Sequence, residues 1–374
     1  MLTFLPQVAL LFFFLSLLED SGYLSRVAFV FEDILSKVGL SGKSVYTLLM
    51  GFGCSTSAVL TARNMEDKNS KIKTALLTPY MSCSAKFPIY SVLGGAFFGA
   101  KNIFVIIGLY FLGVAVAILM SYILEKTFLK SKEQSFILEF PPYRVMSLKR
   151  TFSVLWKNVK EFLLRVGSLI IAMNVIVWVL SNFSFTFSYV EVNGGVSMLE
   201  TLGKILSPIF IPLGFKSWGL VSALIAGLVA KEVIVSSIAL FNGVQESSLG
   251  NLAASIKNSA SPVYFASGAS ALSYLVFCLL YFPCLATMSV LSKEIGKKWT
   301  FIGIGIEFLV AYILSFIVYR IALGFQTFGG LKTTIFCLSL LAIILSFVYV
   351  YKKITKKQCA GCEKCFKPCK NRKK

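Results

Sequence analysis

Histidine is absent from this chain of 374 residues, so no imidazole can serve as a metal ligand or a proton carrier. Charge is also scarce, because 14% of the residues are charged whereas a soluble domain carries about 25%. Hydrophobic residues make up 56% of the chain. These deficits exclude an ordinary soluble domain and imidazole-based chemistry, and they predict that much of the chain lies in lipid.

Two further absences narrow the function. No aromatic–basic motif or nucleic-acid fold signal accompanies the net charge of +20, so we expect no nucleic-acid partner. No basic leader precedes the first apolar stretch, so we expect no cleavable signal peptide. The nine cysteines do not form a secreted disulfide pattern, since four of them cluster in a basic tail that suits a reducing cytosol.

Long apolar segments dominate what is present, and a membrane span needs about 20 mainly apolar residues. The sequence therefore predicts an all-α, polytopic integral membrane bundle with about eight or nine hydrophobic segments. The candidate segments are 2–18, 45–62, 74–99, 102–124, 163–181, 219–241, 264–291, 300–323 and 332–351.

Basic residues collect in segments 63–73, 125–162 and 352–374, which we expect to face the cytoplasm. The part of 125–162 that follows two prolines is amphipathic and is expected to lie on the membrane surface. Five candidate spans separate this segment from the tail, which would put the two on opposite sides. We therefore expect one span not to cross, either 219–241 or 264–291, because backbone breaks at depth must line an enclosed or watery cavity.

Three cysteines stand beside glycine or proline breaks in these apolar segments: Gly51-Phe-Gly-Cys54, Pro79-Tyr-Met-Ser-Cys83 and Phe282-Pro-Cys284. A broken helix frees backbone carbonyls, and a thiolate beside them can bind a soft or borderline cation. The alternative is that each cysteine is a small buried hydrophobe. We interpret Cys278 in that way, since it lies on nearly the opposite helix face from Cys284.

Ionisable residues also occur inside the apolar segments. Lys231 and Glu232 are adjacent, and intramembrane charges are functional by default and face the bundle interior. Glu232 is a candidate cation ligand, and Lys231 would balance charge when the site is empty; alternatively, the pair only fixes two helices in register. Glu307 has the same two interpretations, whereas Lys86 would favour the thiolate form of nearby Cys83.

The tail contains Cys359, Cys362, Cys365 and Cys369 in the order C-x2-C-x2-C-x3-C. This spacing matches an iron–sulfur run, with proline before rather than after the last cysteine, and it could also hold zinc. Alternatively, the tail is flexible and hands on metal or senses redox state. Segment 352–374 also carries many basic residues, which favours a tail associated with lipid.

Several motifs in order resemble the membrane part of the bacterial ferrous-iron transporter B family (FeoB). They are Leu17-Leu-Glu-Asp-Ser-Gly-Tyr23 with Arg26, Gly51-Phe-Gly-Cys54, Pro79-Tyr-Met-Ser-Cys-Ser-Ala-Lys86, Ala230-Lys-Glu-Val233 and Tyr281-Phe-Pro-Cys284. The resemblance implies two gate segments, a multi-pass location in the inner membrane and Fe2+ uptake into the cytoplasm. It implies a permease rather than an enzyme, with Cys54, Cys83 and Cys284 on the iron path.

Under this resemblance the chain divides into parts. They are a first gate half (1–124), an interfacial segment (125–162), a second gate half (163–323), a last span (324–351) and a cytoplasmic tail (352–374). The sequence has no G-x4-G-K-[ST] phosphate loop, so no GTP site is expected in it. We expect a separate GTPase module, small cytoplasmic accessory proteins and a homo-oligomer as partners, in addition to the lipid bilayer.

Two other functions stay open at this point. One is a transporter of nucleosides or other small solutes with the same gate architecture, which would use aromatic stacking and amide donors around the breaks. The other is a membrane protein that does not transport and instead senses metal or redox state through its cysteine tail. Ser57 stands where the family's first gate motif commonly has proline, which would loosen that break.

Overall fold

The structure is a computed structural model, and it describes residues 9–10, 13–14, 22–36, 39–65, 67–127, 129, 156, 160, 167–184, 197–243, 249–258 and 261–328. Contacts divide the chain into two units, Met1–Val318 and Tyr319–Lys374. The described part of the second unit is the last stretch of one helix. The first unit holds all the other described elements and is helical, which confirms the predicted all-α class.

The helices of the first half of the sequence are α2 (Tyr23–Ser36), α3 (Lys43–Gly53), α4 (Ser55–Thr61), α5 (Lys68–Leu77), α6 (Phe87–Phe98) and α7 (Asn102–Thr127). Short 3-10 turns link them: η1 (Ala62–Asn64), η2 (Thr78–Tyr80), η3 (Ser84–Lys86) and η4 (Gly99–Lys101).

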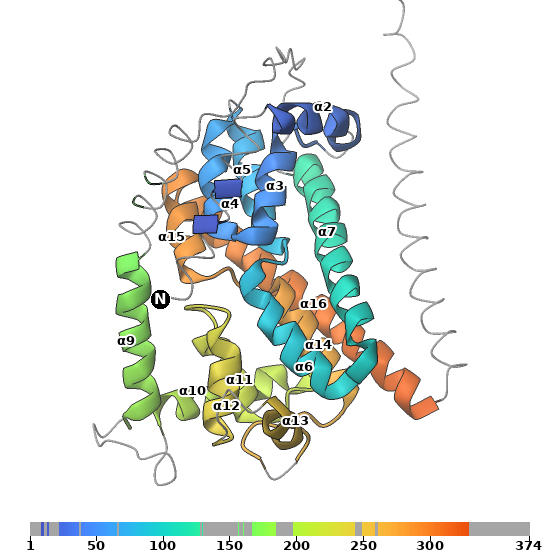
Figure 1. Cartoon of the computed structure of the whole chain (residues 1–374), viewed down its shortest axis with the longest axis vertical. Coiled ribbons are helices and arrows are strands. Elements are labelled where there is room, and N and C mark those ends of the chain that lie inside the picture. Colours follow the sequence, from blue (N-terminus) through green and yellow to red (C-terminus); the bar gives the residue numbers. More distant parts are fainter. Residues whose placement is uncertain are drawn as a thin grey trace, which may run out of the picture. The chain divides into compact units, whose positions relative to one another are not determined.

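The second half continues with α9 (Ser168–Asn182), α10 (Met198–Phe210), η6 (Ile211–Leu213), α11 (Trp218–Ala226), α12 (Val233–Phe241), α13 (Leu249–Lys257), α14 (Gly268–Leu280), α15 (Leu285–Glu294) and α16 (Lys297–Phe328). In the first unit, α3, α4, α5 and α15 gather at one end and α10–α13 at the other, while α6, α7 and α14 run between them (Figure 1).

Four of the candidate membrane segments are broken. Segment 45–62 breaks at Cys54, which has extended backbone between α3 and α4 (φ −149°, ψ 118°). Segment 74–99 breaks over 78–86, and segment 264–291 breaks over 281–284. These are the predicted glycine and proline breaks. Segment 219–241 also divides, into α11 and α12, so both segments suspected of not crossing are interrupted.

The breaks explain why few uninterrupted helices have the length of a span. Among the described residues, three stretches are long and apolar enough to cross a membrane: Lys68–Thr127 and Gly268–Glu294, which each contain a break, and Lys297–Gly324, which does not. A fourth is added if Met198–Leu213 and Trp218–Ala226, which meet at 105°, form one span. Segment 332–351 and most of 2–18 lie outside the described residues, as does most of the interfacial segment 125–162.

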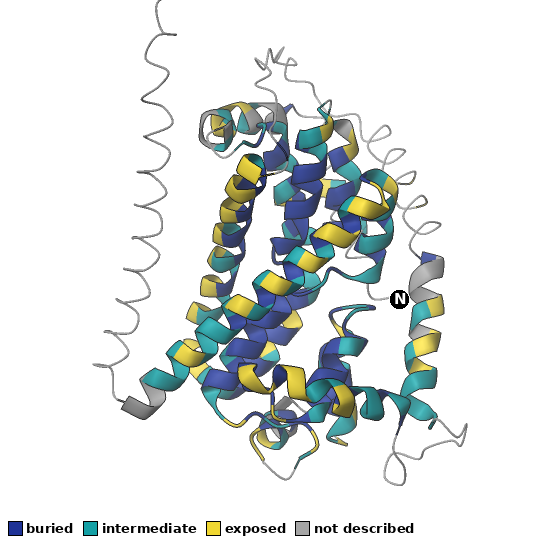
Figure 2. Cartoon of the chain, turned by 180° about the vertical axis from the view of Figure 1, so that it is seen from behind, coloured by how far each residue is buried: buried dark blue, intermediate teal, exposed yellow. Residues whose placement is uncertain are grey.

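The core of the first unit is built around α14, which is buried on every side (Figure 2). Its Tyr274 and Phe277 rings meet the Phe215 ring edge-on, with centroids 5.2 and 5.9 Å away. Fully buried apolar rings of this size contribute strongly to stability. The core therefore holds α14 rigidly at the centre, directly before the break that leads to Cys284.

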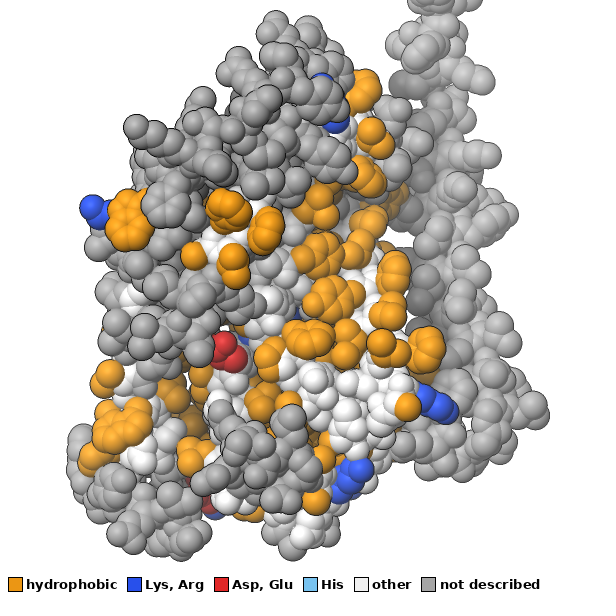
Figure 3. All heavy atoms as spheres, in the orientation of Figure 1, with side chains coloured by type: hydrophobic (Ala, Val, Ile, Leu, Met, Phe, Trp, Pro, Cys, Tyr) orange, Lys and Arg blue, Asp and Glu red, His pale blue; other side chains and the backbone are white. Residues whose placement is uncertain are grey.

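Helix α7 is apolar on both faces. Leu109, Val116 and Met120 are buried, whereas Phe104 and Phe111 are more than 70% exposed. A helix that is hydrophobic all round is typical of a membrane span. Figure 3 shows the exposed apolar side chains gathered over this helix. We therefore assign this surface to lipid.

Ion pairs fasten the two halves of the sequence together. Glu294, the last residue of α15, pairs with Arg63 of η1 and with Lys71 of α5, whose ammonium is 3.0 Å away. Fully buried Lys73 pairs with Glu125 of α7. The two Glu294 pairs cross from the first half of the sequence to the second and tie α15 to η1 and α5, whereas the Lys73–Glu125 pair joins α5 to α7 within the first half.

Helix α7 touches the second break through a glycine. A methyl group placed on Gly113 would lie 2.7 Å from the backbone oxygen of Tyr80 in η2. Real side chains do not approach a backbone oxygen so closely, so only glycine lets α7 pack at this distance. The glycine thus fixes the position of the break that carries Cys83.

We expect Gly113→Ala to destabilise the protein by about 1–3 kcal/mol, because the added methyl group must push α7 away from η2. Gly108→Ala is the matched control in the same helix, since nothing lies within 4 Å of its added methyl group. Thermal unfolding in detergent measures both. Equal stability of the two variants would contradict the close packing.

Candidate functional site

The helix breaks meet around one cavity of about 120 Å³, which is large enough for an ion with several water molecules. Each of the four breaks supplies part of the wall. The lining residues are 53–56, 79, 83–86, 229–233, 281–284, 286 and 287. Segments that are more than 200 residues apart in sequence are thereby brought to one place.

Lys86 satisfies carbonyls that the breaks set free. It is 3% exposed, and its Nζ donates to the oxygens of Pro79 (3.2 Å), Met81 (3.1 Å) and Leu279 (2.7 Å). An ammonium has three hydrogens, so these bonds use all its donors. These bonds give Lys86 a structural role that the sequence analysis did not predict: it links the break in the first half to α14.

Other hydrogen bonds join the breaks in pairs. The Ser84 hydroxyl donates to the oxygen of Gly53 at 2.9 Å, which joins the first two breaks. The Leu285 amide donates to the oxygen of Leu228 at 3.0 Å, which joins the last two. A buried carbonyl without a partner is costly, so these bonds make the breaks depend on one another.

Three thiols line the cavity, one from each predicted break. Cys54 lies between α3 and α4, Cys83 precedes η3 and Cys284 precedes α15; all three are half-buried. Cys278 is fully buried in α14 and does not line the cavity, which confirms its interpretation as a core residue. The structure therefore distinguishes three thiols that line the cavity from one thiol that is packed in the core.

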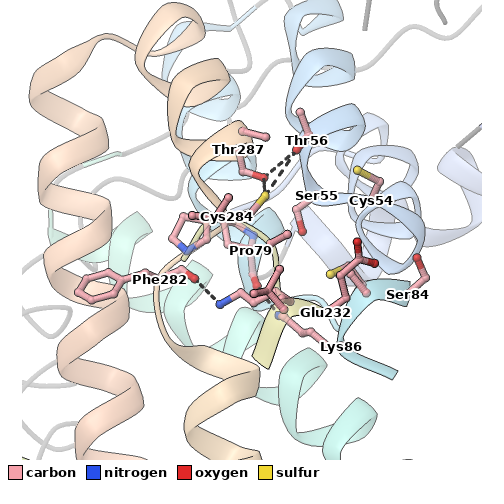
Figure 4. Close-up of a pocket in the computed structure, with 18 of the residues that line it drawn as sticks. Cys54, Ser55, Thr56, Pro79, Ser84, Lys86, Glu232, Phe282, Cys284 and Thr287 are labelled. Carbon is pink, nitrogen blue, oxygen red and sulfur yellow. Dashed lines mark hydrogen bonds between the residues drawn. The ribbon is translucent and has the colours of Figure 1, made fainter. Parts of the chain in front are cut away.

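Two threonines hold the Cys284 thiol. The Sγ atom is 3.1 Å from the Oγ1 atom of Thr287 and 3.9 Å from that of Thr56, and the two hydroxyls are 2.9 Å apart (Figure 4). Thr287 was not singled out from the sequence. The signal that could have found Thr287 is its spacing. It lies three residues after Cys284, so its side chain falls on the same helix face about one turn further along.

Lys231 and Glu232 are separated rather than paired in the cavity wall. Lys231 is 4% exposed; its Nζ donates to the oxygen of Phe282 at 2.6 Å and lies 3.2 Å from the centre of the Tyr281 ring. Glu232 is exposed. Both residues line the cavity, as expected of intramembrane charges, and Glu232 does so from the turn before α12.

Cys54, Ser84 and Glu232 lie on one side of the cavity in Figure 4, and Cys284 with its threonines lies on the other. Within the described ranges, no three or more cysteine, aspartate or glutamate side chains converge closely enough to hold a metal ion. The four candidate ligands thus surround the cavity without forming a closed metal centre. The four tail cysteines lie outside the described residues.

Comparisons with known proteins agree with this architecture. Residues 1–97 and 163–298 match the Gate family, which is described as nucleoside recognition. The chain belongs to the Gate family. Residues 106–158 also match the family described as ferrous iron transport protein B C terminus. The resemblance to the membrane part of that transporter family is thereby confirmed.

Similar proteins carry the name Fe(2+) transporter FeoB. One from Staphylococcus aureus (strain COL) is 38% identical over 321 residues, which cover 86% of this chain and 47% of that protein. One from Methanocaldococcus jannaschii is 37% identical over 323 residues, covering 85% and 47%. The chain therefore spans about half the length of these relatives.

A third relative, from Porphyromonas gingivalis, is named Fe(2+) transport protein A/Fe(2+) transporter FeoB fusion protein. It is 34% identical over 364 residues, which cover 87% of this chain and 43% of that protein. No solved structure matches the chain.

We expect Lys86→Met to destabilise the protein severely, because it leaves three buried carbonyls without a donor at about 1–3 kcal/mol each. The control is Lys101→Met, which removes an exposed lysine in η4. Thermal unfolding in detergent compares them. If Lys86→Met unfolds at the same temperature as the control, the breaks do not depend on this ammonium.

Proposed function

We propose that this chain carries ferrous iron across the bacterial inner membrane into the cytoplasm, as the permease part of a GTPase-linked uptake system. The observation that carries the proposal is a single cavity whose wall combines three thiols and a carboxylate, each placed at a helix break. The names of the relatives, Fe(2+) transporter FeoB, support the choice of cargo.

The ligand chemistry suits a borderline divalent cation. Thiolate sulfur and carboxylate oxygen together favour a first-row metal over the harder Mg2+ or Ca2+. Cys54, Cys83, Cys284 and Glu232 supply these groups, and the hydroxyls of Thr56 and Thr287 add neutral oxygens. Ligands that surround a cavity without closing on one point suit transport, because a moving ion must bind weakly enough to leave.

Lys231 acts as the resident cation of the empty cavity. Its ammonium is held by the Phe282 carbonyl and the Tyr281 ring, where it offsets the partial negative charge of the break. An entering Fe2+ repels this ammonium and is stabilised by thiolates, so the thiols must release protons as the metal binds. Fe2+ therefore competes with Lys231 for the same polar wall.

The partners follow from the relatives. A fusion protein with Fe(2+) transport protein A supports a small accessory partner for this chain. The relatives are about twice as long as the part matched here, which leaves room for a GTPase module, either in the same chain or as a separate one. A homo-oligomer and a metal-handling role for the four tail cysteines remain part of the proposal.

A nucleoside cargo fits the cavity less well, although the matched family is described as nucleoside recognition. Sites for small organic molecules enclose about 300–1,000 Å³, whereas this cavity holds about 120 Å³. The Tyr281 ring is covered by the Lys231 ammonium rather than open for stacking. Size and lining therefore favour an ion.

We expect Cys54→Ala, Cys83→Ala and Cys284→Ala each to weaken Co2+ binding by at least about tenfold, because each removes a cavity ligand. Co2+ reports thiolate coordination through its sulfur-to-metal charge-transfer absorption. Fe2+ uptake into proteoliposomes, with a GTPase partner present, should fall in the same variants.

Cys278→Ala is the matched control, since that thiol lies in the core and does not line the cavity. It should bind Co2+ and support uptake as the unaltered chain does. The proposal fails if the three cavity variants match the Cys278 variant in both measurements.

A further inference from the structure

Helix α16 presents a buried face whose residues recur every fourth position: Gly303, Glu307, Ala311 and Ser315. Two contacts of this face are tight, and an aromatic pair beside it adds a third. A methyl group on Gly303 would lie 2.4 Å from Leu76 of α5, and the Ser315 hydroxyl lies 2.8 Å from that of Ser273 in α14. Phe308 stacks on Phe282 with ring centres 5.0 Å apart. Glu307 therefore sits in the packed layer behind the cavity.

The Glu307 carboxyl group is buried without full hydrogen bonding. The residue is 2% exposed, and its Oε2 atom has no hydrogen-bond partner among the described residues. It does not line the cavity. An ionised carboxylate in such a place is costly unless a positive charge or a hydrogen-bond donor lies beside it. The surroundings of Glu307 therefore decide whether its carboxyl group is protonated.

Three titratable groups lie near enough to Glu307 to interact with it electrostatically: the phenol of Tyr80 and the ammonium groups of Lys86 and Lys231. Lys86 has committed all three donors to backbone oxygens. Lys231 donates to the Phe282 oxygen and faces the Tyr281 ring. Both ammonium groups are thus engaged with the helix breaks and do not hydrogen-bond to Glu307.

We propose that Glu307 is a proton-binding site coupled to the metal cavity. In the empty protein the carboxyl group carries its proton, which removes the cost of an unpaired buried charge. When a divalent cation enters and displaces Lys231, the added positive charge favours the carboxylate. The O–H bond then breaks, its electrons stay on the oxygen and the proton is released to bulk water. This inference rests on the proposed cation site.

Infrared spectroscopy of the full chain in lipid tests the proton directly. The empty protein should show the carbonyl stretch of a buried carboxylic acid, and Co2+ should remove it. Glu307→Gln should lack this band, whereas Glu200→Gln, which alters a carboxylate paired with Lys204 in α10, should keep it. Should the glutamine variant not fold, Glu307→Asp retains the acid and should shift the band.

Proton counting completes the test. Proton release on Co2+ binding, measured with a pH indicator, should be smaller by about one proton in Glu307→Gln than in the unaltered chain. The Co2+ affinity of Glu307→Gln should also rise less steeply with pH than that of the unaltered chain. The difference should be about tenfold per pH unit, because one proton fewer is released. An unchanged acid band in Glu307→Gln, or an equal proton count, would overturn the inference while leaving the cation site standing. Failure of the unaltered chain to bind Co2+ would instead overturn the proposed function.

Discussion

The structure depends on satisfying backbone carbonyls where helices break inside an apolar bundle. Lipid and apolar side chains offer no donors, so each orphan carbonyl costs several kcal/mol, on the order of a lost hydrogen bond in hydrocarbon. Lys86, Lys231 and Ser84 supply the missing donors, and the Leu285 amide supplies another. Most of these bonds join distant parts of the sequence: Lys86 reaches Leu279 at the end of α14, Lys231 reaches Phe282, Ser84 reaches Gly53 and Leu285 reaches Leu228. The breaks are therefore stable only when they lie together.

This solution gives the cavity its electrostatic character. Two buried ammonium groups stand at its wall, so the empty cavity favours anions and neutral dipoles over a bare cation. A divalent cation can enter only where groups able to become negative are close by. Three thiols and Glu232 provide them in the wall, and Glu307 provides another behind it. The need to satisfy backbone and the need to balance charge thus place lysines and acids in one small volume.

The sequence predicted what is decided locally. Glycine and proline act on their own turn, so the breaks at Cys54, Cys83 and Cys284 could be placed without a structure. Partners across the fold could not. The bond from Lys86 to Leu279 joins residues 193 apart, and the exposure of Glu232 depends on where the other three breaks end. The unpartnered oxygen of Glu307 likewise follows from donors committed elsewhere, which no pattern within α16 records.

The contrast between two neighbouring cysteines bears on the choice of function. Cys278 and Cys284 are free thiols six residues apart, yet one is sealed in α14 and the other reaches the cavity, because the break at 281–284 lies between them. Among the described cysteines, each thiol that lines the cavity comes from its own break and faces a shared space. Thiols distributed in this way can hand an ion from one to the next, and an arrangement that spreads ligands along a wall favours passage over storage.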